Sequence, residues 1–127
     1  MRDLVLIING VYDLLCAASI LWLENLPFFK TLSELHPTMF AEKKHSGNPV
    51  VRRLLAYWLI TYGMVRTVAG FHPERHLYFA AALTYFIEAF SFEYENRVGG
   101  TLVPSKVAFV SIVSALMGVW ILISLIK

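Results

Sequence analysis

The sequence predicts an all-α polytopic membrane protein, with four transmembrane helices in an up-down bundle and a short interfacial amphipathic helix between the first two. Two observations carry this prediction. Apolar residues make up 57% of the 127 residues and charged residues only 16%, against roughly 45–50% and 25% in soluble domains. A soluble domain this small exposes much of its surface to water, so we expect the apolar excess to face lipid. In addition, four apolar runs have about the 20 residues that a membrane-spanning helix needs.

Composition and charge also exclude several classes of protein. The single cysteine, Cys16, cannot form a disulfide framework, and the apolar content excludes a disordered chain or a soluble enzyme with a second substrate domain. The net charge is only +2, and the 11 Lys and Arg residues are scattered along the chain. This distribution gives no concentrated basic face for nucleic acid.

The expected spans are residues 4–23, 54–71, 76–94 and 103–126, which make residues 1–127 a single integral-membrane domain. The first three contain Asp13, Arg66 and Glu88, respectively, and Lys106 lies near the start of the fourth. The links after the second and third spans are short. Short links favour antiparallel neighbours, which predicts the up-down order.

The longer connector, residues 24–53, predicts the short amphipathic helix. Pro27 can open a helix. The apolar residues that follow it and share one helical face are Phe28, Phe29, Leu32 and Leu35, and those on the opposite face are Lys30, Ser33 and Glu34. A helix with this pattern is expected to lie in the headgroup layer of the membrane.

Basic residues near the membrane predict the orientation. On one side are Lys30, Lys43, Lys44, Arg52, Arg53, Arg97 and Lys106, and on the other are Arg2, Arg75 and Lys127. The excess of Lys and Arg usually stays on the side from which the protein is inserted. We therefore expect both termini on the far side, which is the lumen or its equivalent.

Small residues mark the helix faces that are expected to pack closely against other helices. They are Gly10 and Ala17 in the first span, Ala56, Gly63 and Gly70 in the second, and Ser111, Ser114, Ala115 and Gly118 in the fourth. The face of the fourth span could pack either inside the bundle or against a partner protein.

The charged residues inside the spans are expected to form two structural ion pairs. Asp13 and Arg66 share faces with small residues, and they lie about 13 Å and about 8 Å from the terminal side. We expect these two residues to pair with each other. Glu88 lies nearer the opposite surface, where Lys106 is its expected partner. The alternative interpretation is a polar site that serves as a proton path, a ligand pocket or a catalytic acid.

No catalytic, cofactor-binding or metal-ligating residue is predicted. His72 and His76 have the i, i+4 spacing of a helical metal site, but Pro73 marks a helix boundary between them. Nucleophile motifs, glycine-rich phosphate loops and zinc spacings are absent from the sequence.

One stretch of the sequence resembles a known family. Arg53-Leu54-Leu55-Ala56-Tyr57-Trp58 is followed eight residues later by Arg66, and then by the pair Leu77-Tyr78 and by Ala82-Leu83-Thr84-Tyr85-Phe86. These motifs are similar to those of the four-helix scaffold family of ergosterol biosynthesis. The matching motif residues are Arg53, Trp58, Arg66, Leu77, Tyr78 and Phe86. The resemblance, mainly over residues 53–127, implies a protein of the endoplasmic reticulum that tethers the sterol C-4 demethylation enzymes.

The residues alone favour a non-catalytic scaffold or accessory subunit that holds other integral-membrane proteins in a hetero-oligomeric complex, in contact with membrane lipids and without nucleic acid. One alternative is an accessory subunit of a respiratory, ATP-synthase or photosystem complex in a mitochondrial inner or thylakoid membrane. A second alternative is a small sterol isomerase-like or lipid-binding membrane protein, in which an acid such as Glu88 would line a pocket.

Overall fold

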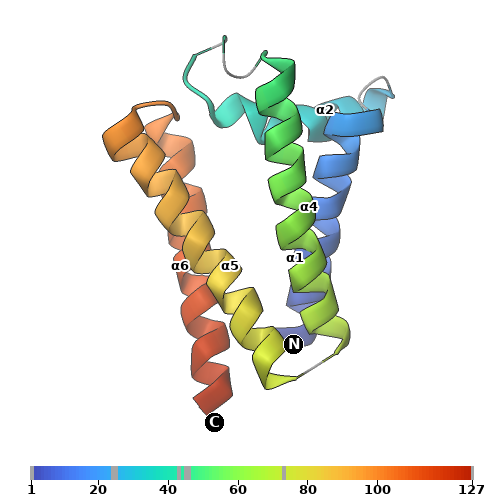
Figure 1. The fold of residues 1–127 in the computed structure, drawn as a ribbon, viewed down its shortest axis with the longest axis vertical. Coiled ribbons are helices and arrows are strands. Elements are labelled where there is room, and N and C mark those ends of the chain that lie inside the picture. The colour runs from blue at the N-terminus through green and yellow to red at the C-terminus, as the bar shows by residue number, and fades with distance from the viewer. Residues whose placement is uncertain (1, 24–25, 43, 45–46, 73, 127) are drawn as a thin grey trace.

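A computed structural model of the chain describes residues 2–23, 26–42, 44, 47–72 and 74–126. The helical elements are α1 (Arg2–Ala18), η1 (Ser19–Leu23), α2 (Pro27–Leu35), η2 (Pro37–Met39), α4 (Pro49–Phe71), α5 (Arg75–Tyr94), η3 (Glu95–Gly99) and α6 (Pro104–Ile126). The predicted all-α class is confirmed. Figure 1 shows α1 beside α4 and α5 beside α6, with α2 lying across the end of the bundle opposite the two chain termini.

Among the described residues, three helical segments are long and apolar enough to cross a membrane. They are Arg2–Leu23, Pro49–Phe71 and Pro104–Ile126. The expected span 76–94 falls within α5, which is not among these three and carries Glu88, Glu93 and several tyrosines. Helix α4 begins at Pro49, five residues before the expected span, because the Asn48 side chain caps it by accepting hydrogen bonds from the Val50 and Val51 amides.

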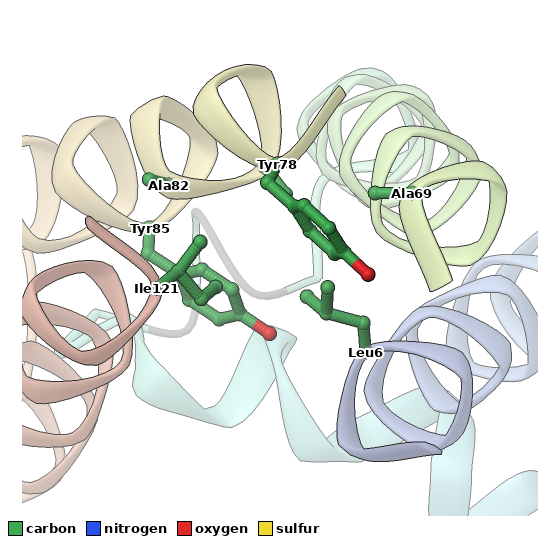
Figure 2. Packing of buried hydrophobic residues seen from close by; sticks show 7 residues of the cluster. Leu6, Ala69, Tyr78, Ala82, Tyr85 and Ile121 are labelled. Atoms are coloured by element: carbon green, nitrogen blue, oxygen red, sulfur yellow. The ribbon is translucent and has the colours of Figure 1, made fainter. Parts of the chain in front are cut away.

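Three apolar clusters form the interior of the described part of the chain. The cluster nearest the termini contains residues from all four long helices. Its buried members are Leu6, Ala69, Tyr78, Ala81, Ala82, Tyr85 and Ile121. Figure 2 shows the Tyr78 and Tyr85 side chains projecting from α5 into this interior, opposite Leu6 of α1. The other two clusters lie nearer α2, where Leu32 of α2 packs against Cys16, Ala17, Ile20, Leu55, Ala56 and Leu59.

The small-residue faces pack within the chain. A Cβ atom added at Gly63 would lie 2.8 Å from the Gly10 carbonyl oxygen and 2.8 Å from Leu14 Cγ, so the α1 and α4 backbones nearly touch there. Gly70 makes a similar approach to the first turns of α1, and Ala17 and Ala56 are fully buried. The small residues that lie between the two helices are Gly10, Ala17, Ala56, Gly63 and Gly70.

The fourth-span face also packs inside the chain. A Cβ atom added at Gly118 would lie 2.9 Å from Phe86 Cζ on α5. Ser111 and Ser114 are buried, and Ala115 is half-buried.

Hydrogen bonds join the helix pairs at both ends of the bundle. Near the termini, Arg2 Nη1 on α1 donates to Ser124 Oγ on α6 over 2.7 Å. At the opposite end, the segment after α2 pairs with the link before α6 through an isolated bridge between Phe40 and Leu102. Two backbone hydrogen bonds of 2.8 and 2.7 Å flank this bridge.

Candidate functional site

Arg66 occupies the centre of the bundle and is only 1% exposed. It lies on α4, three residues after Gly63 and four before Gly70, which places it on the face that packs closely against α1. A guanidinium at this depth is costly to bury and has to be neutralised and hydrogen-bonded by neighbouring groups.

Side chains from α1 and α5 supply those partners. Arg66 Nη1 lies 2.7 Å from Asp13 Oδ2 and donates to Asn9 Oδ1 over 3.0 Å. Arg66 Nη2 lies 2.5 Å from Glu88 Oε2, and Nε donates to Thr84 Oγ1 over 3.1 Å. The guanidinium therefore ties three helices together.

Two tyrosine rings complete the surroundings of the guanidinium. Its central carbon lies 3.7 Å from the ring centroid of Tyr85 and 5.1 Å from that of Tyr62. The Tyr85 hydroxyl donates to Asn9 Oδ1 over 2.5 Å, so Asn9 accepts from both Tyr85 and Arg66. Cation–π contacts that are desolvated in this way contribute about 2 kcal/mol.

The structure brings Asp13 and Arg66 together but does not bring Glu88 and Lys106 together. Glu88 lies one helical turn beyond Thr84 on α5, on the face that points to Arg66. Lys106 is exposed in the first turn of α6 and donates to the Thr38 carbonyl oxygen over 3.1 Å. The expected Glu88–Lys106 pair is therefore wrong, because the buried guanidinium has enough donors to bind both acids.

Sequence reasoning did not find Asn9, Thr84 and Tyr85 as members of this cluster. A signal was present for two of them. Asn9 precedes Asp13 by four residues, and Thr84 precedes Glu88 by four, so each shares a helical face with an acid. Nothing in the spacing distinguishes Tyr85 from the other tyrosines of α5.

A cavity of about 370 Å³ lies beside the cluster, between α1 and α6. Asp13, Glu88 and Arg66 line its floor, and apolar residues of α6 line one wall. His36, in the turn between α2 and η2, lies at the end near α2. Its Nδ1 atom is buried and has no hydrogen-bond partner among the residues described. Burial and the positive charge of Arg66 lower the pKa of His36 to about 4, so its imidazole is neutral near pH 7.

A sequence model described as "Erg28 like protein" matches residues 12–120 of the chain. The chain belongs to the Erg28-like family. This family is known in general terms for membrane proteins of ergosterol biosynthesis and is associated with the endoplasmic reticulum. No curated protein and no solved structure matches the chain.

Most of the Erg28-like motif residues lie inside the bundle. Trp58 packs edge-on against Tyr62, with ring centroids 5.3 Å apart, and also stacks at a tilt on Phe92. The Tyr78 hydroxyl donates to Asp3, and the Tyr78 ring lies under the Arg2 guanidinium.

The remaining motif residues divide between interior and surface. Leu77 and Phe86 pack against the cluster nearest the termini. Arg53 is exposed in the early turns of α4.

The described part of the Erg28-like chain contains no group of three or more His, Cys, Asp or Glu residues that could hold a metal ion. His72 is exposed at the end of α4, and His76 Nε2 lies 3.2 Å from Glu74 Oε2 at the start of α5. Both acids in the interior, Asp13 and Glu88, contact Arg66. The cluster can therefore hold helices in register and present hydrogen-bond acceptors to the cavity.

Proposed function

We propose that this Erg28-like chain is a non-catalytic scaffold or accessory subunit of the endoplasmic-reticulum membrane, which holds the sterol C-4 demethylation enzymes together. The observation that carries the proposal is the contact of both interior acids, Asp13 and Glu88, with Arg66. An isomerase needs an acid that gives and takes a proton, and each of these carboxylates would first have to leave its ion pair. A rigid bundle is instead what a scaffold requires.

In this proposal the chain crosses the membrane four times. Helices α4 and α6 both run from the α2 end of the bundle to the end that holds the termini, and α5 runs in the opposite direction beside them (Figure 1). With 20 residues, α5 is about 30 Å long, which matches the hydrocarbon thickness. Thr84, Tyr85 and Glu88 of α5 face Arg66 rather than lipid, so these polar groups do not prevent the helix from crossing.

The α2 end lies at the surface from which the protein is inserted. Described basic residues at this end are Lys30, Lys44, Arg52, Arg53, Arg97 and Lys106, and Lys43 lies outside the described residues. The opposite end carries Arg2 and Arg75, and Lys127 is also outside them. Helix α2 then lies in the headgroup layer, where Arg52 Nη2 contacts Glu34 Oε1 at 3.0 Å.

Affinity purification of the tagged full chain in mild detergent tests the proposal, with an unrelated tagged protein of the same membrane as the control. We expect stoichiometric recovery of the sterol C-4 demethylation enzymes with the chain and not with the control. Stoichiometric recovery of respiratory, ATP-synthase or photosystem subunits would replace the proposal with the energy-converting alternative. Sterol turnover by the purified chain alone would contradict a non-catalytic role.

A further inference from the structure

The cavity between α1 and α6 opens at its side. The Arg2–Ser124 hydrogen bond joins the two helices at the end near the termini, and His36 lines the cavity at the end near α2. At the open side, Tyr12 and Phe109 are 40% and 71% exposed. In a membrane-spanning bundle this opening faces the lipid.

The two surfaces of this cavity differ in chemistry. Apolar side chains form most of its walls, and Ser114 of α6 also lines it. The apolar wall residues are Val5 on α1 and Phe109, Val110, Val113 and Met117 on α6. Polar side chains form its floor, which are Asn9, Asp13, Arg66, Tyr85 and Glu88. A second cavity of about 480 Å³ shares Tyr12, His36, Phe109 and Val110 with it and extends it toward α2. The volume of about 370 Å³ falls in the range of small-molecule sites, roughly 300–1,000 Å³.

The charges on the cavity floor favour one kind of ligand group over others. Asp13 and Glu88 together carry two carboxylates against the one guanidinium of Arg66. The floor therefore has an excess of hydrogen-bond acceptors, and a group that donates a hydrogen bond satisfies it. A phosphate would add negative charge next to the excess carboxylate and would be repelled.

The depth of the cavity floor in the membrane also favours an uncharged group. Asp13 is 11 residues beyond Arg2, or about 16 Å along α1, and Glu88 is 6 residues before Tyr94, or about 9 Å along α5. A charged headgroup would have to leave the interface and lose its hydration to reach them. A small uncharged headgroup reaches this depth at far lower cost.

We propose that the cavity between α1 and α6 binds a neutral lipid whose hydroxyl group donates a hydrogen bond to Asp13 or Glu88, while its apolar body lies against Val113 and the other wall residues. Sterols and diacylglycerols both have this chemistry. The site does not depend on the scaffold role, because the lipid occupies the opening between two helices of a single chain.

Photocrosslinking of the full chain in phosphatidylcholine vesicles tests the site. Three diazirine-bearing probes are added separately in trace amounts: a sterol, a diacylglycerol and a phosphatidylcholine. We expect the sterol or the diacylglycerol to label peptides of α1 and α6 that line the cavity, and the arm that labels identifies the source. Labelling of these peptides by phosphatidylcholine to the same extent would overturn the proposal.

A matched pair of variants on α6 shows whether the label enters the cavity. Val113→Trp fills the opening, whereas Val119→Trp adds the same bulk at a position that does not line the cavity; the two valines are 43% and 45% exposed. Val113→Trp should lower labelling to the level of the phosphatidylcholine probe, and Val119→Trp should leave it unchanged. Val113→Phe and Val119→Phe replace this pair if size-exclusion chromatography shows that a Trp variant is misfolded.

Competition with unlabelled lipid tests the hydroxyl group without any change in the protein. The free hydroxyl lipid should compete about tenfold better than its methyl ether, because the ether cannot donate to a carboxylate. Equal competition by the two compounds, or equal labelling of both Trp variants, would overturn the proposal.

Discussion

Arg66 Nη2 on α4 and Glu88 Oε2 on α5 lie 2.5 Å apart, and this contact joins the α1–α4 pair to the α5–α6 pair inside the bundle. The same guanidinium reaches Asp13 on α1. Three helices therefore converge on one side chain, and its polar contacts to them lie at a single level of the bundle. Because of this arrangement, the loss of stability should depend on which member of the cluster is replaced.

Removing Arg66 should be more damaging than removing the whole cluster. Arg66→Leu leaves Asp13 and Glu88 buried without a cation, which costs about 3–5 kcal/mol. The triple variant Arg66→Leu, Asp13→Asn, Glu88→Gln leaves no unpaired charge and should be more stable than the single variant. Thermal unfolding in detergent measures the difference. Equal loss of stability in both proteins would contradict the ion-pair interpretation.

The close approach of α1 and α4 should not tolerate a methyl group. Gly63→Ala places a Cβ atom 2.8 Å from the Gly10 carbonyl oxygen, so the helices must move apart. We expect a loss of about 1–3 kcal/mol. Thr61→Ala on the exposed face of the same helix is the control, with a change within about 0.5 kcal/mol. If Gly63→Ala is as stable as the control in the same unfolding assay, the backbones are not in contact.

The α4 cap should tolerate only a residue that accepts a hydrogen bond. Asn48 Oδ1 accepts from Val50 N over 2.9 Å and from Val51 N over 3.3 Å. Asn48→Ala should cost about 0.5–2 kcal/mol, and Asn48→Ser should restore most of this loss. Thermal unfolding of both variants checks this, and a serine variant as unstable as the alanine variant would argue against the cap.

His36 should make the protein less stable in acid. Its pKa is lowered to about 4 from its ordinary 6.5 by burial and by Arg66. The folded state therefore binds a proton less readily than the unfolded state, and stability falls as the pH drops from about 6.5 toward 4. His36→Gln should show a smaller loss over this interval, measured as the unfolding midpoint at pH 7 and pH 4. Parallel pH profiles for the two proteins would mean that His36 is not buried.

Four crossings place the two ends of α5 on opposite sides of the membrane. In a Cys16→Ser background, Val98→Cys in η3 and Glu74→Cys before α5 put single exposed thiols at these two ends. A membrane-impermeant maleimide added to sealed microsomes should label Val98→Cys, and it should label Glu74→Cys only after permeabilisation. Labelling of both cysteine variants in sealed microsomes would place both ends of α5 on the same side of the membrane and would contradict four crossings.

The sequence predicts the long helices and the Asp13–Arg66 contact, because the length of an apolar run and the spacing of small residues are local properties. The contact of Glu88 could not, because it depends on how far α5 is shifted along α4. Depth counted from the helix ends placed Glu88 near Lys106. The packed bundle instead turns Glu88 and Thr84 toward Arg66, and the reach of a guanidinium covers the remaining offset. The role of the small residues on α6 was equally undetermined, since the same pattern serves inner and outer contacts.

The backbone pairing of Phe40 with Leu102 has a mechanical consequence. It closes the bundle into a ring, because the segment after α2 is bonded to the link that leads into α6, while the α4–α5 connection joins the pairs at the other end. A displacement of α2 would therefore have to break these hydrogen bonds or carry the start of α6 with it. Any two proteins bound to these elements would be held at a constant separation.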